Sequence, residues 1–255
     1  ADEPLEVAFG SHLYFRGHDN ALATVDALLD RHGMDGASEV LLAGCSAGAI
    51  GAVLLADQLR ERIRARARRS VFVAAMADSG VFPEWPGVSP PAGLLSFPQF
   101  EWIHRFTNAS FAAPAACASL GFGWKCLQIT VALPHVSTPV FVLQSAVDSW
   151  HVSRTRDERS LHELASRIRE EVIPAARWPH AGAIDSCFHH CGAWGDIRWT
   201  GQSNSELFQR WYAARRLEWS SDSPSAVGGT YEGWPAVHVA EPVEGTCYAG
   251  EEEHR

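Results

Sequence analysis

The sequence has little positive charge. Lysine occurs once, at Lys125, and 30 acidic side chains against 21 cationic ones leave a formal net charge of −9. Phosphate backbones and anionic lipid headgroups repel an acidic surface. The composition therefore argues against nucleic acids and anionic membrane surfaces as partners.

Long hydrophobic runs are also missing. A membrane-spanning helix needs roughly 20 consecutive apolar residues, and no run in this chain approaches that length. The N-terminus begins Ala-Asp-Glu-Pro, without the basic start and the apolar stretch of a signal peptide. We expect no membrane span, and we expect that a signal was removed or that the chain is a fragment.

The chain nevertheless contains enough apolar residues, 46% of 255, to bury one large α/β core. Apolar runs typical of buried strands alternate with helical patterns, which predicts a mainly parallel sheet with helices on both faces. Ligands of such sheets bind beyond the carboxyl ends of the strands. The expected strands are residues 12–17, 39–44, 71–77 and 139–144, and the expected helices are 21–32, 49–68, 97–111, 154–172 and 203–217.

Two segments differ in composition from the rest. We expect residues 1–219 to form a single domain. Residues 220–255 are poor in hydrophobic residues and end in an acidic run, so we expect a loosely ordered tail. Residues 78–123 are rich in Pro, Gly and Trp, and a loop this long is usually functional or carries short helices.

Four of the six cysteines form pairs that are close in sequence: Cys117 with Cys126, and Cys187 with Cys191. Short-range pairs in Gly-rich or His-rich loops indicate disulfides and an oxidising compartment. Asn108 begins an Asn-Ala-Ser glycosylation signal, which agrees with secretion.

The pentapeptide Gly-Cys-Ser-Ala-Gly at residues 44–48 follows an apolar run and precedes a helical pattern. A sharp strand–turn–helix junction of this kind exposes the central serine hydroxyl at the sheet edge. Ser46 is therefore a candidate nucleophile, and Ala47 N–H, at the start of the helix, is a candidate donor to an oxyanion. The alternative is an ordinary tight turn.

A serine nucleophile needs a base, and the base needs a carboxylate that orients it. Asp148 leaves the end of the strand predicted at 139–144, and His189 and His190 follow in a later loop. This is the chain order Ser, Asp, His of α/β-hydrolases. Asp148 could instead only cap a helix, and Asp78, which also follows a strand, is the competing acid.

Other roles for the histidine-rich loop stay open. His180, His189 and His190 lie near two cysteines, which suggests zinc, although a second ligand group at finger-like spacing is missing. The ten tryptophans are expected mainly in the core and in interfaces, with sugar platforms as the alternative.

Several separated blocks resemble the pectinacetylesterase family, which also contains the carboxylesterase Notum. They occur in family order over roughly residues 12–212. The blocks are Tyr-Phe-Arg-Gly at 14–17, Gly-Cys-Ser-Ala-Gly at 44–48, Asp-Ser-Gly-Val-Phe at 78–82, Trp-Lys-Cys at 124–126, the strand ending in Val-Asp-Ser-Trp at 147–150, and Ser-Cys-Phe-His-His-Cys at 186–191.

The resemblance implies an α/β-hydrolase fold, hydrolysis of an acyl ester and no cofactor. It assigns Ser46 as the nucleophile, Asp148 as the acid and His190, rather than His189, as the base; Asp78 then becomes structural. It also implies that Phe82 is a wall of the acyl pocket.

The chain departs from the family pattern in two places. The family's glycine-rich segment upstream of Tyr14 is absent, so we expect the first strands of the domain to be missing and a sheet edge to be exposed. Leu127 and Gln128 replace two phenylalanines that the family often has in the acyl pocket. An amide is unfavourable there, so we expect a short acyl group such as acetyl.

The sequence thus predicts a secreted serine carboxylesterase that removes acetyl groups from a polysaccharide such as pectin. The alternative is a catalytically inactive, truncated relative that binds glycans. Cys45 is expected to be a buried free thiol, although an upstream cysteine in a longer chain could pair with it or with Cys247. The oligomeric state and the alcohol part of the substrate are left open.

Overall fold

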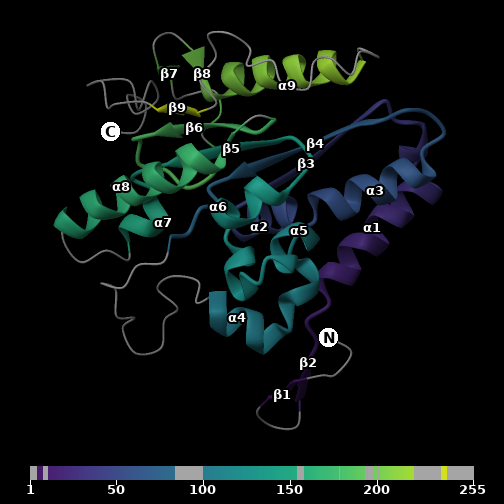
Figure 1. Cartoon of the computed structure of the whole chain (residues 1–255), viewed down its shortest axis with the longest axis horizontal. Coiled ribbons are helices and arrows are strands. Elements are labelled where there is room, and N and C mark those ends of the chain that lie inside the picture. The colour runs from purple at the N-terminus through teal and green to yellow at the C-terminus, as the bar shows by residue number, and fades with distance from the viewer. Residues whose placement is uncertain are drawn as a thin grey trace, which may run out of the picture.

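The structure is a computed structural model in which residues 5–7, 11–83, 100–153, 158–177, 179–192, 194, 198–199, 202–220 and 237–239 are described. Its centre is a parallel sheet of five strands in the order β3-β4-β5-β6-β9 (Figure 1). The strands are β3 (Glu39–Cys45), β4 (Phe72–Asp78), β5 (Val140–Ser145), β6 (Ala181–Asp185) and β9 (Val237–Val239).

Helices cover both faces of this sheet. The helix α9 (Asn204–Ser220) lies on one face, and α2 (Ala47–Leu54), α6 (Ile129–Ala132) and α8 (Glu158–Ala175) lie on the other (Figure 1). The remaining elements are α1 (Gly17–Arg31), α3 (Ala56–Arg66), α4 (Phe100–Thr107), α5 (Ala115–Ser119), α7 (Ser149–Val152), short 3₁₀ helices at Met34–Gly36, Ala109–Ala112, Gly123–Leu127 and Leu133–His135, and two antiparallel pairs, β1 (Leu5–Val7) with β2 (Ser11–Leu13) and β7 (Arg198–Trp199) with β8 (Gln202–Ser203).

Alternate residues of the central strands fill two separate cores. Phe141 and Leu143 of β5 pack against Trp211 of α9, whereas Val140 and Val142 pack on the opposite face with α2 and α8. Both faces of β4 and β5 are buried, which is why these strands are continuous apolar runs rather than alternating ones. The apolar residues of α8 recur every four positions, at Leu164, Ile168 and Val172.

The helix expected at 49–68 is two helices that meet at Leu55. Leu54 packs with Phe82, whereas Leu55 belongs to a third core, with Val25 and Leu59. Successive residues of a continuous helix point about 100° apart. The break between α2 and α3 lets the two neighbouring leucines enter different cores.

Two strands of the central sheet, β6 and β9, are not among the expected ones, and neither are the short strands β1, β7 and β8. β6 lies in the segment that the sequence presents as a histidine-rich loop, because three of its five residues are Ala or Gly and only Ile184 is β-branched. A Cβ at Gly182 would lie 2.8 Å from the backbone oxygen of Val142, so this strand requires a residue without a side chain there. β9 falls inside the expected tail and pairs with β6, and Ser220 is the last residue of α9. Residues 221–236 and 240–255 of that tail are outside the described residues.

Smaller differences concern element ends. The short N-terminal strand is β2, which ends at Leu13, and α1 begins at Gly17, before the expected helix start. α8 begins at Glu158 and runs to Ala175. No helix in the described part of the chain combines the length and apolar character needed to cross a membrane.

Candidate active site

Three of the candidate residues follow strands of the parallel sheet. Ser46 follows β3, Asp148 follows β5 and His190 lies in the loop after β6. These strands lie in the order β3-β4-β5-β6 and run in the same direction. Their carboxyl ends therefore meet at one edge, where ligands of parallel sheets bind.

Ser46 occupies a sharp turn between β3 and α2. Its φ angle is 57°, in the region that residues with a side chain rarely adopt. The Ser46 backbone N–H donates to the Asp78 carbonyl at 2.8 Å, and Ser46 carbonyl oxygen accepts from Ala49 N–H. A Cβ at Gly44 would lie 2.0 Å from the backbone oxygen of Gly48, so the close approach of β3 to α2 requires glycine at position 44.

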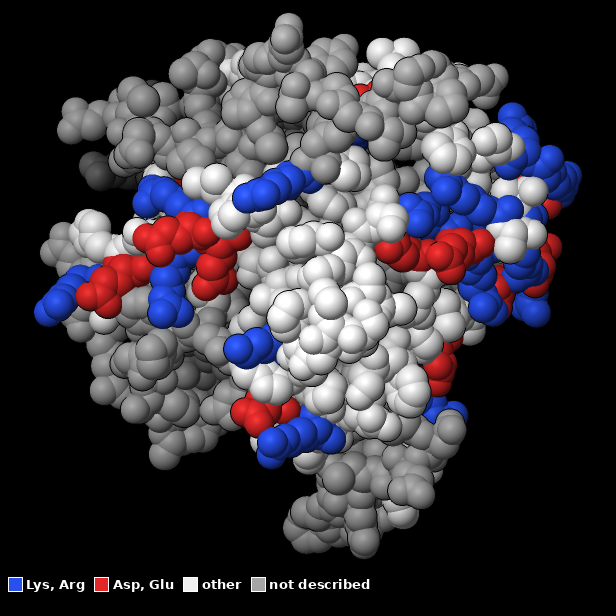
Figure 2. All heavy atoms as spheres, viewed as in Figure 1, with Lys and Arg blue, Asp and Glu red and all other residues white. Residues whose placement is uncertain are grey.

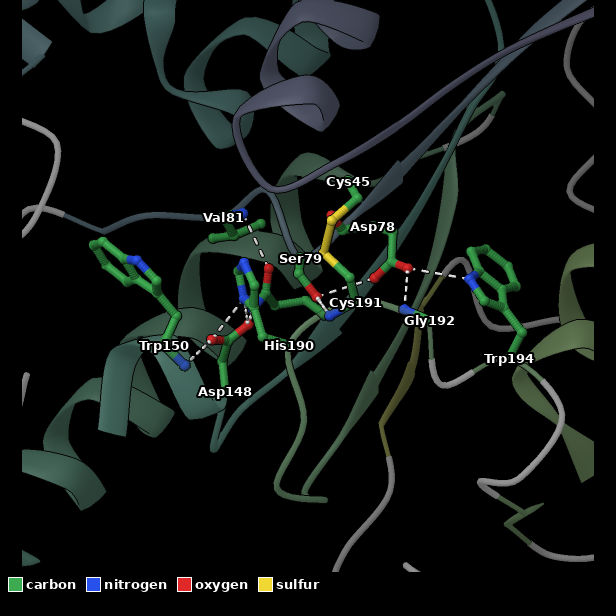
Figure 3. Close-up of a disulfide and its surroundings, with 11 residues drawn as sticks. Cys45, Asp78, Ser79, Val81, Asp148, Trp150, His190, Cys191, Gly192 and Trp194 are labelled. Atoms are coloured by element: carbon green, nitrogen blue, oxygen red, sulfur yellow. Dashed lines mark hydrogen bonds and ion pairs between the residues drawn. A yellow bond between two sulfur atoms is a disulfide. The ribbon is translucent and has the colours of Figure 1, made fainter. Parts of the chain in front are cut away.

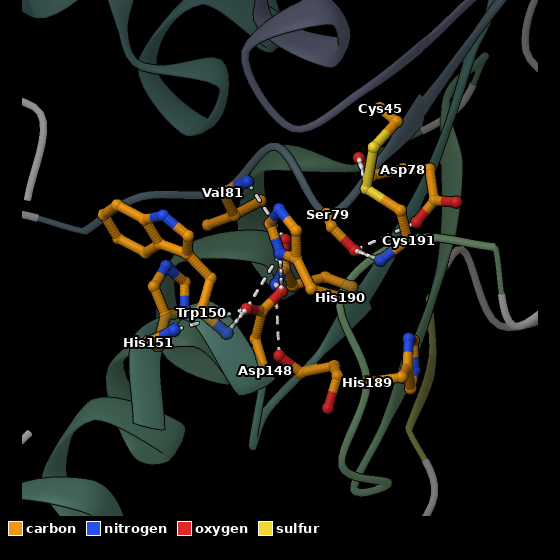
Figure 4. A network of polar contacts seen from close by, with 12 residues as sticks. Cys45, Asp78, Ser79, Val81, Asp148, Trp150, His151, His189, His190 and Cys191 are labelled. Carbon is orange, nitrogen blue, oxygen red and sulfur yellow. Dashed lines mark hydrogen bonds and ion pairs between the residues drawn. A yellow bond between two sulfur atoms is a disulfide. The ribbon is translucent and has the colours of Figure 1, made fainter. Parts of the chain in front are cut away.

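Asp148 and His190 form a hydrogen-bonded pair. His190 Nδ1 lies 2.9 and 2.8 Å from the two carboxylate oxygens, and the Asp148 side chain is fully buried (Figure 4). Because Nδ1–H donates to the carboxylate, the lone pair of the ring is on Nε2, the nitrogen that can accept a proton. This is the arrangement that a general base requires.

Asp148 also caps α7, so the two roles considered for it coexist. Its Oδ1 accepts from the backbone N–H groups of Trp150 and His151. Gln144 donates its amide to Oδ2 and accepts Val81 N–H. Sequence reasoning identifies Gln144 only as the end of a strand and does not reveal this role.

His189 is not part of this pair. Its Nε2 lies 3.0 Å from both carboxylate oxygens of Asp185, the last residue of β6. Burial lowers the pKa of His189, but the hydrogen bond and the negative charge of Asp185 outweigh that effect, so the pKa is raised. The two neighbouring histidines thus have separate carboxylates.

Asp78 also has partners of its own. Its carboxylate accepts from Ser79 Oγ, from the Gly192 N–H and from the Trp194 indole N–H (Figure 3). Through these bonds it joins the end of β4 to the loop that carries His190. This is a structural arrangement, and Asp78 does not bond to either histidine in the described residues.

The structure corrects the disulfide pairing. Cys191 is bonded to Cys45, with a Cα–Cα distance of 5.9 Å, and not to Cys187 (Figure 3). Cys45 is therefore neither free nor buried, since it lies at the exposed end of β3. Parallel strands bring residues 146 positions apart to the same sheet edge, which spacing along the sequence does not reveal.

The other four cysteines are Cys117, Cys126, Cys187 and Cys247. Cys117 and Cys126 are bonded to each other, as their spacing predicts. Cys187 is also disulfide-bonded, to a partner outside the described residues. Cys247 lies outside them as well.

Two of the expected acyl-pocket residues are buried. Phe82 and Leu127 pack in one apolar cluster with Phe100, and the Phe82 ring makes an edge-on contact with Trp150. Trp150 links this cluster to Asp148, which accepts its backbone N–H. Gln128, next to Leu127, is half-buried.

An open cavity of about 620 Å³ lies between the start of α1 and the segment after α4, and Phe82, Leu127 and Gln128 do not line it. Its lining includes Phe15, His18 and Phe111. Asn108, the expected glycosylation site, is exposed and also lines this cavity. Among the described residues, no three His, Cys, Asp or Glu side chains are grouped so that they could hold a metal ion.

The fold and this edge define an α/β-hydrolase-like protein: a parallel sheet lies between helices, and a serine at a strand–turn–helix junction shares one sheet edge with a carboxylate–histidine pair. A sequence model of the pectinacetylesterase domain matches residues 5–166. The chain belongs to the pectinacetylesterase family.

Individual relatives agree with this assignment. The chain is 23% identical to pectin acetylesterase 7 of Arabidopsis thaliana over 84% of its own length and 61% of that protein. It is 30% identical to the palmitoleoyl-protein carboxylesterase Notum of Schmidtea mediterranea over 53% of this chain and 27% of that one. The chain therefore spans under two thirds of the length of these relatives.

A solved structure shows the same fold. The Wnt deacylase Notum from Drosophila superimposes with a TM-score of 0.71 at 21% sequence identity. The match covers 84% of this chain and 64% of the Notum chain.

Proposed function

We propose that this protein is a serine carboxylesterase whose triad is Ser46, Asp148 and His190. The observation that carries the proposal is the bond between His190 Nδ1 and the buried Asp148 carboxylate, at the sheet edge where Ser46 follows β3. Membership of the pectinacetylesterase family supports the reaction class. Ser46 Oγ makes no hydrogen bond in the described residues, and contacts between nucleophile and base often form only with substrate present.

The reaction has two steps. His190 Nε2 takes the proton of Ser46 Oγ as the oxygen attacks the ester carbonyl, and the same proton passes to the departing alcohol. A water molecule, deprotonated by His190, then attacks the acyl-serine and releases the carboxylic acid. Ala47 N–H lies in the first turn of α2, where backbone N–H groups have no acceptor within the helix, so it can donate to the carbonyl oxygen as charge develops.

We further propose that the substrate is an acetyl ester on an extracellular polysaccharide such as pectin. Several relatives are pectin acetylesterases. The half-buried amide of Gln128 beside Leu127 is unfavourable for a long acyl chain. Secretion is supported by the two disulfides and by the exposed Asn108.

A fluorophosphonate probe tests the triad, because a competent Ser46 displaces fluoride and retains the phosphonyl group on Oγ. We expect labelling of the intact protein, and loss of labelling in Ser46→Ala. His190→Gln should lower the rate of nitrophenyl acetate hydrolysis by a factor on the order of 10⁶, as for other triads that act as a unit. In His189→Gln the Asp148 pair is intact, so the loss should be far smaller. Equal losses in the two histidine variants would contradict the assignment.

A second candidate is a glycan-binding protein without activity. Trp102 and Phe106 of α4 are exposed, with ring centroids 4.3 Å apart, and an exposed aromatic face is a surface on which a sugar can pack. This candidate predicts no labelling of the intact protein together with measurable binding of pectin fragments that Trp102→Ala abolishes. Labelling that depends on Ser46 would exclude it.

A further inference from the structure

We infer that the Cys45–Cys191 disulfide is a positioning group that holds the His190 ring at the Ser46 hydroxyl. The inference rests on the proposed function. Cys45 directly precedes Ser46, and Cys191 directly follows His190. The bond therefore joins the backbone of the nucleophile to the backbone of the base.

Chain geometry sets how tight this coupling is. The two cysteine Cα atoms are 5.9 Å apart, and consecutive Cα atoms are 3.8 Å apart, so the Cα atoms of Ser46 and His190 are held within about 13.5 Å of each other. The backbone between them is 146 residues long when measured from one cysteine to the other. Without the disulfide, only non-covalent contacts would keep the two residues together.

The bond also fixes a backbone conformation. Cys191 has a φ angle of 64°, which a residue with a side chain rarely adopts without external constraint. The disulfide and the bond from Cys191 N–H to Ser79 Oγ hold it there (Figure 3). When the disulfide is absent, only the bond to Ser79 Oγ still holds this conformation, so Cys191 is freer to return to a negative φ angle, and that rotation would move the neighbouring His190.

Other contacts of the same loop remain when the disulfide is removed. His189 keeps its bond to Asp185, and the His189 carbonyl accepts Ser149 N–H. Gly192 N–H donates to Asp78 (Figure 3). The loop should therefore stay folded on the sheet. The expected defect is a displacement of the imidazole and not a loss of structure.

The chain provides a matched control. Cys117–Cys126 is also a disulfide, but both cysteines are fully buried and join two neighbouring short helices at a separation of only nine residues. Removing it costs stability without changing the coupling between Ser46 and His190. The test variants are therefore Cys45→Ala/Cys191→Ala and Cys117→Ala/Cys126→Ala.

Kinetics separate positioning from stability. A misplacement of about 1 Å can cost 10²-fold in rate. With nitrophenyl acetate, we expect Cys45→Ala/Cys191→Ala to lose roughly 30- to 100-fold in kcat with KM changed by less than about threefold, and to lose fluorophosphonate labelling rate in parallel. The melting temperature of the control variant should fall. Its kcat, measured below that melting temperature, should stay unchanged. A kcat within threefold of wild type in the first variant would overturn the inference.

A measurement that does not depend on activity distinguishes this outcome from failure of the proposed function. The ring signal of His190 in an NMR spectrum, assigned by its absence in His190→Gln, should shift or broaden in Cys45→Ala/Cys191→Ala and stay in place in the control. If the wild type is inactive and unlabelled, the proposed function fails, and the ring signal alone decides the positioning role. An unchanged ring signal would then overturn it.

Discussion

At the scale of single residues, three side-chain-bearing residues around the candidate site have positive φ angles: Ser46, Ser79 and Cys191. Each such conformation costs about 1–3 kcal/mol and persists only where its surroundings enforce it. Here the three residues and their direct neighbours hold one another in place. Ser79 Oγ accepts the backbone N–H of Cys191, and Cys191 is disulfide-bonded to Cys45. Ser46 N–H donates to the carbonyl oxygen of Asp78, the residue before Ser79. Unfavourable backbone conformations thus cluster where the chemistry is proposed.

His180 predicts a pH dependence of stability. Burial lowers its pKa from 6.5 to about 4, while its Nδ1 accepts Val140 N–H and joins the starts of β5 and β6. Below pH 6.5 the unfolded chain binds a proton that the folded protein does not, so stability falls as the pH falls from 6.5 to 4. The loss should approach about 3 kcal/mol.

His180→Asn tests this, because an amide oxygen can accept Val140 N–H without titrating. Urea unfolding between pH 7.5 and 4.5 should show a shallower decline for His180→Asn than for wild type. His162→Asn, at an exposed position of α8, is the control and should follow the wild-type curve. Equal slopes for wild type and His180→Asn would refute the prediction.

Gln128 predicts acyl-chain selectivity. A half-buried amide beside the apolar cluster of Phe82 and Leu127 disfavours long chains, so nitrophenyl acetate should be cleaved faster than nitrophenyl octanoate. Gln128→Leu should raise the octanoate-to-acetate ratio of kcat/KM by roughly tenfold. Faster cleavage of octanoate by the wild type would rule out the preference for short chains.

At the scale of elements, the strand–turn–helix of β3 and α2 uses its two glycines differently. Gly44 faces the backbone of Gly48 at a distance that excludes any Cβ, whereas a Cβ at Gly48 would have no neighbour within 4 Å. Close backbone packing therefore requires only the first glycine. The same crowding explains Gly80, where a Cβ would lie 2.6 Å from the Ala49 side chain.

Paired substitutions follow from this difference. Gly44→Ala should destabilise the protein by about 3 kcal/mol or more and abolish activity, because α2 must move away from β3. Gly48→Ala lies inside the first turn of α2 and should fold normally, with stability unchanged or raised by about 0.5–1 kcal/mol. Thermal melts of the two variants give the comparison, and a stable, active Gly44→Ala protein would contradict it.

The elements also show what the sequence could predict. β3, β4 and β5 are predictable because each contains a continuous apolar run, although only β4 and β5 are buried on both faces. β6 is not predictable in this way, because its sequence, Ala-Gly-Ala-Ile-Asp, is poor in residues with high strand propensity. Close packing against β5 requires a residue without a side chain at Gly182. The Cys45–Cys191 bond could not be predicted either, since it depends on the order of strands in the sheet. The choice between His189 and His190 came from the family resemblance and stays a proposal.

At the scale of the whole molecule, the described sheet ends at β3, which pairs with β4 alone. Leu41 and Ala43 of β3 are exposed on one face. Charged side chains gather over α8 and over α1 and α3, and the surface between them is largely uncharged (Figure 2). An edge strand with exposed apolar residues promotes association between chains.

Leu41→Lys should therefore raise the protein concentration at which light scattering begins, because a charge on an edge strand opposes pairing. Leu28→Lys is the matched control: Leu28 lies on α1 with 38% of its surface exposed, against 39% for Leu41. The control should scatter light at the wild-type concentration. If both lysine variants improve solubility equally, net charge and not the strand edge is responsible.

The Cys45–Cys191 bond also decides what a single cut in the backbone does. Because it closes a loop from the end of β3 to the segment after β6, a protease that nicks the chain anywhere between these cysteines leaves both fragments on one covalent molecule. The nicked protein would migrate as an intact chain on a non-reducing gel and as two pieces on a reducing one. Ser46 and His190 stay tethered even though they then belong to different polypeptides.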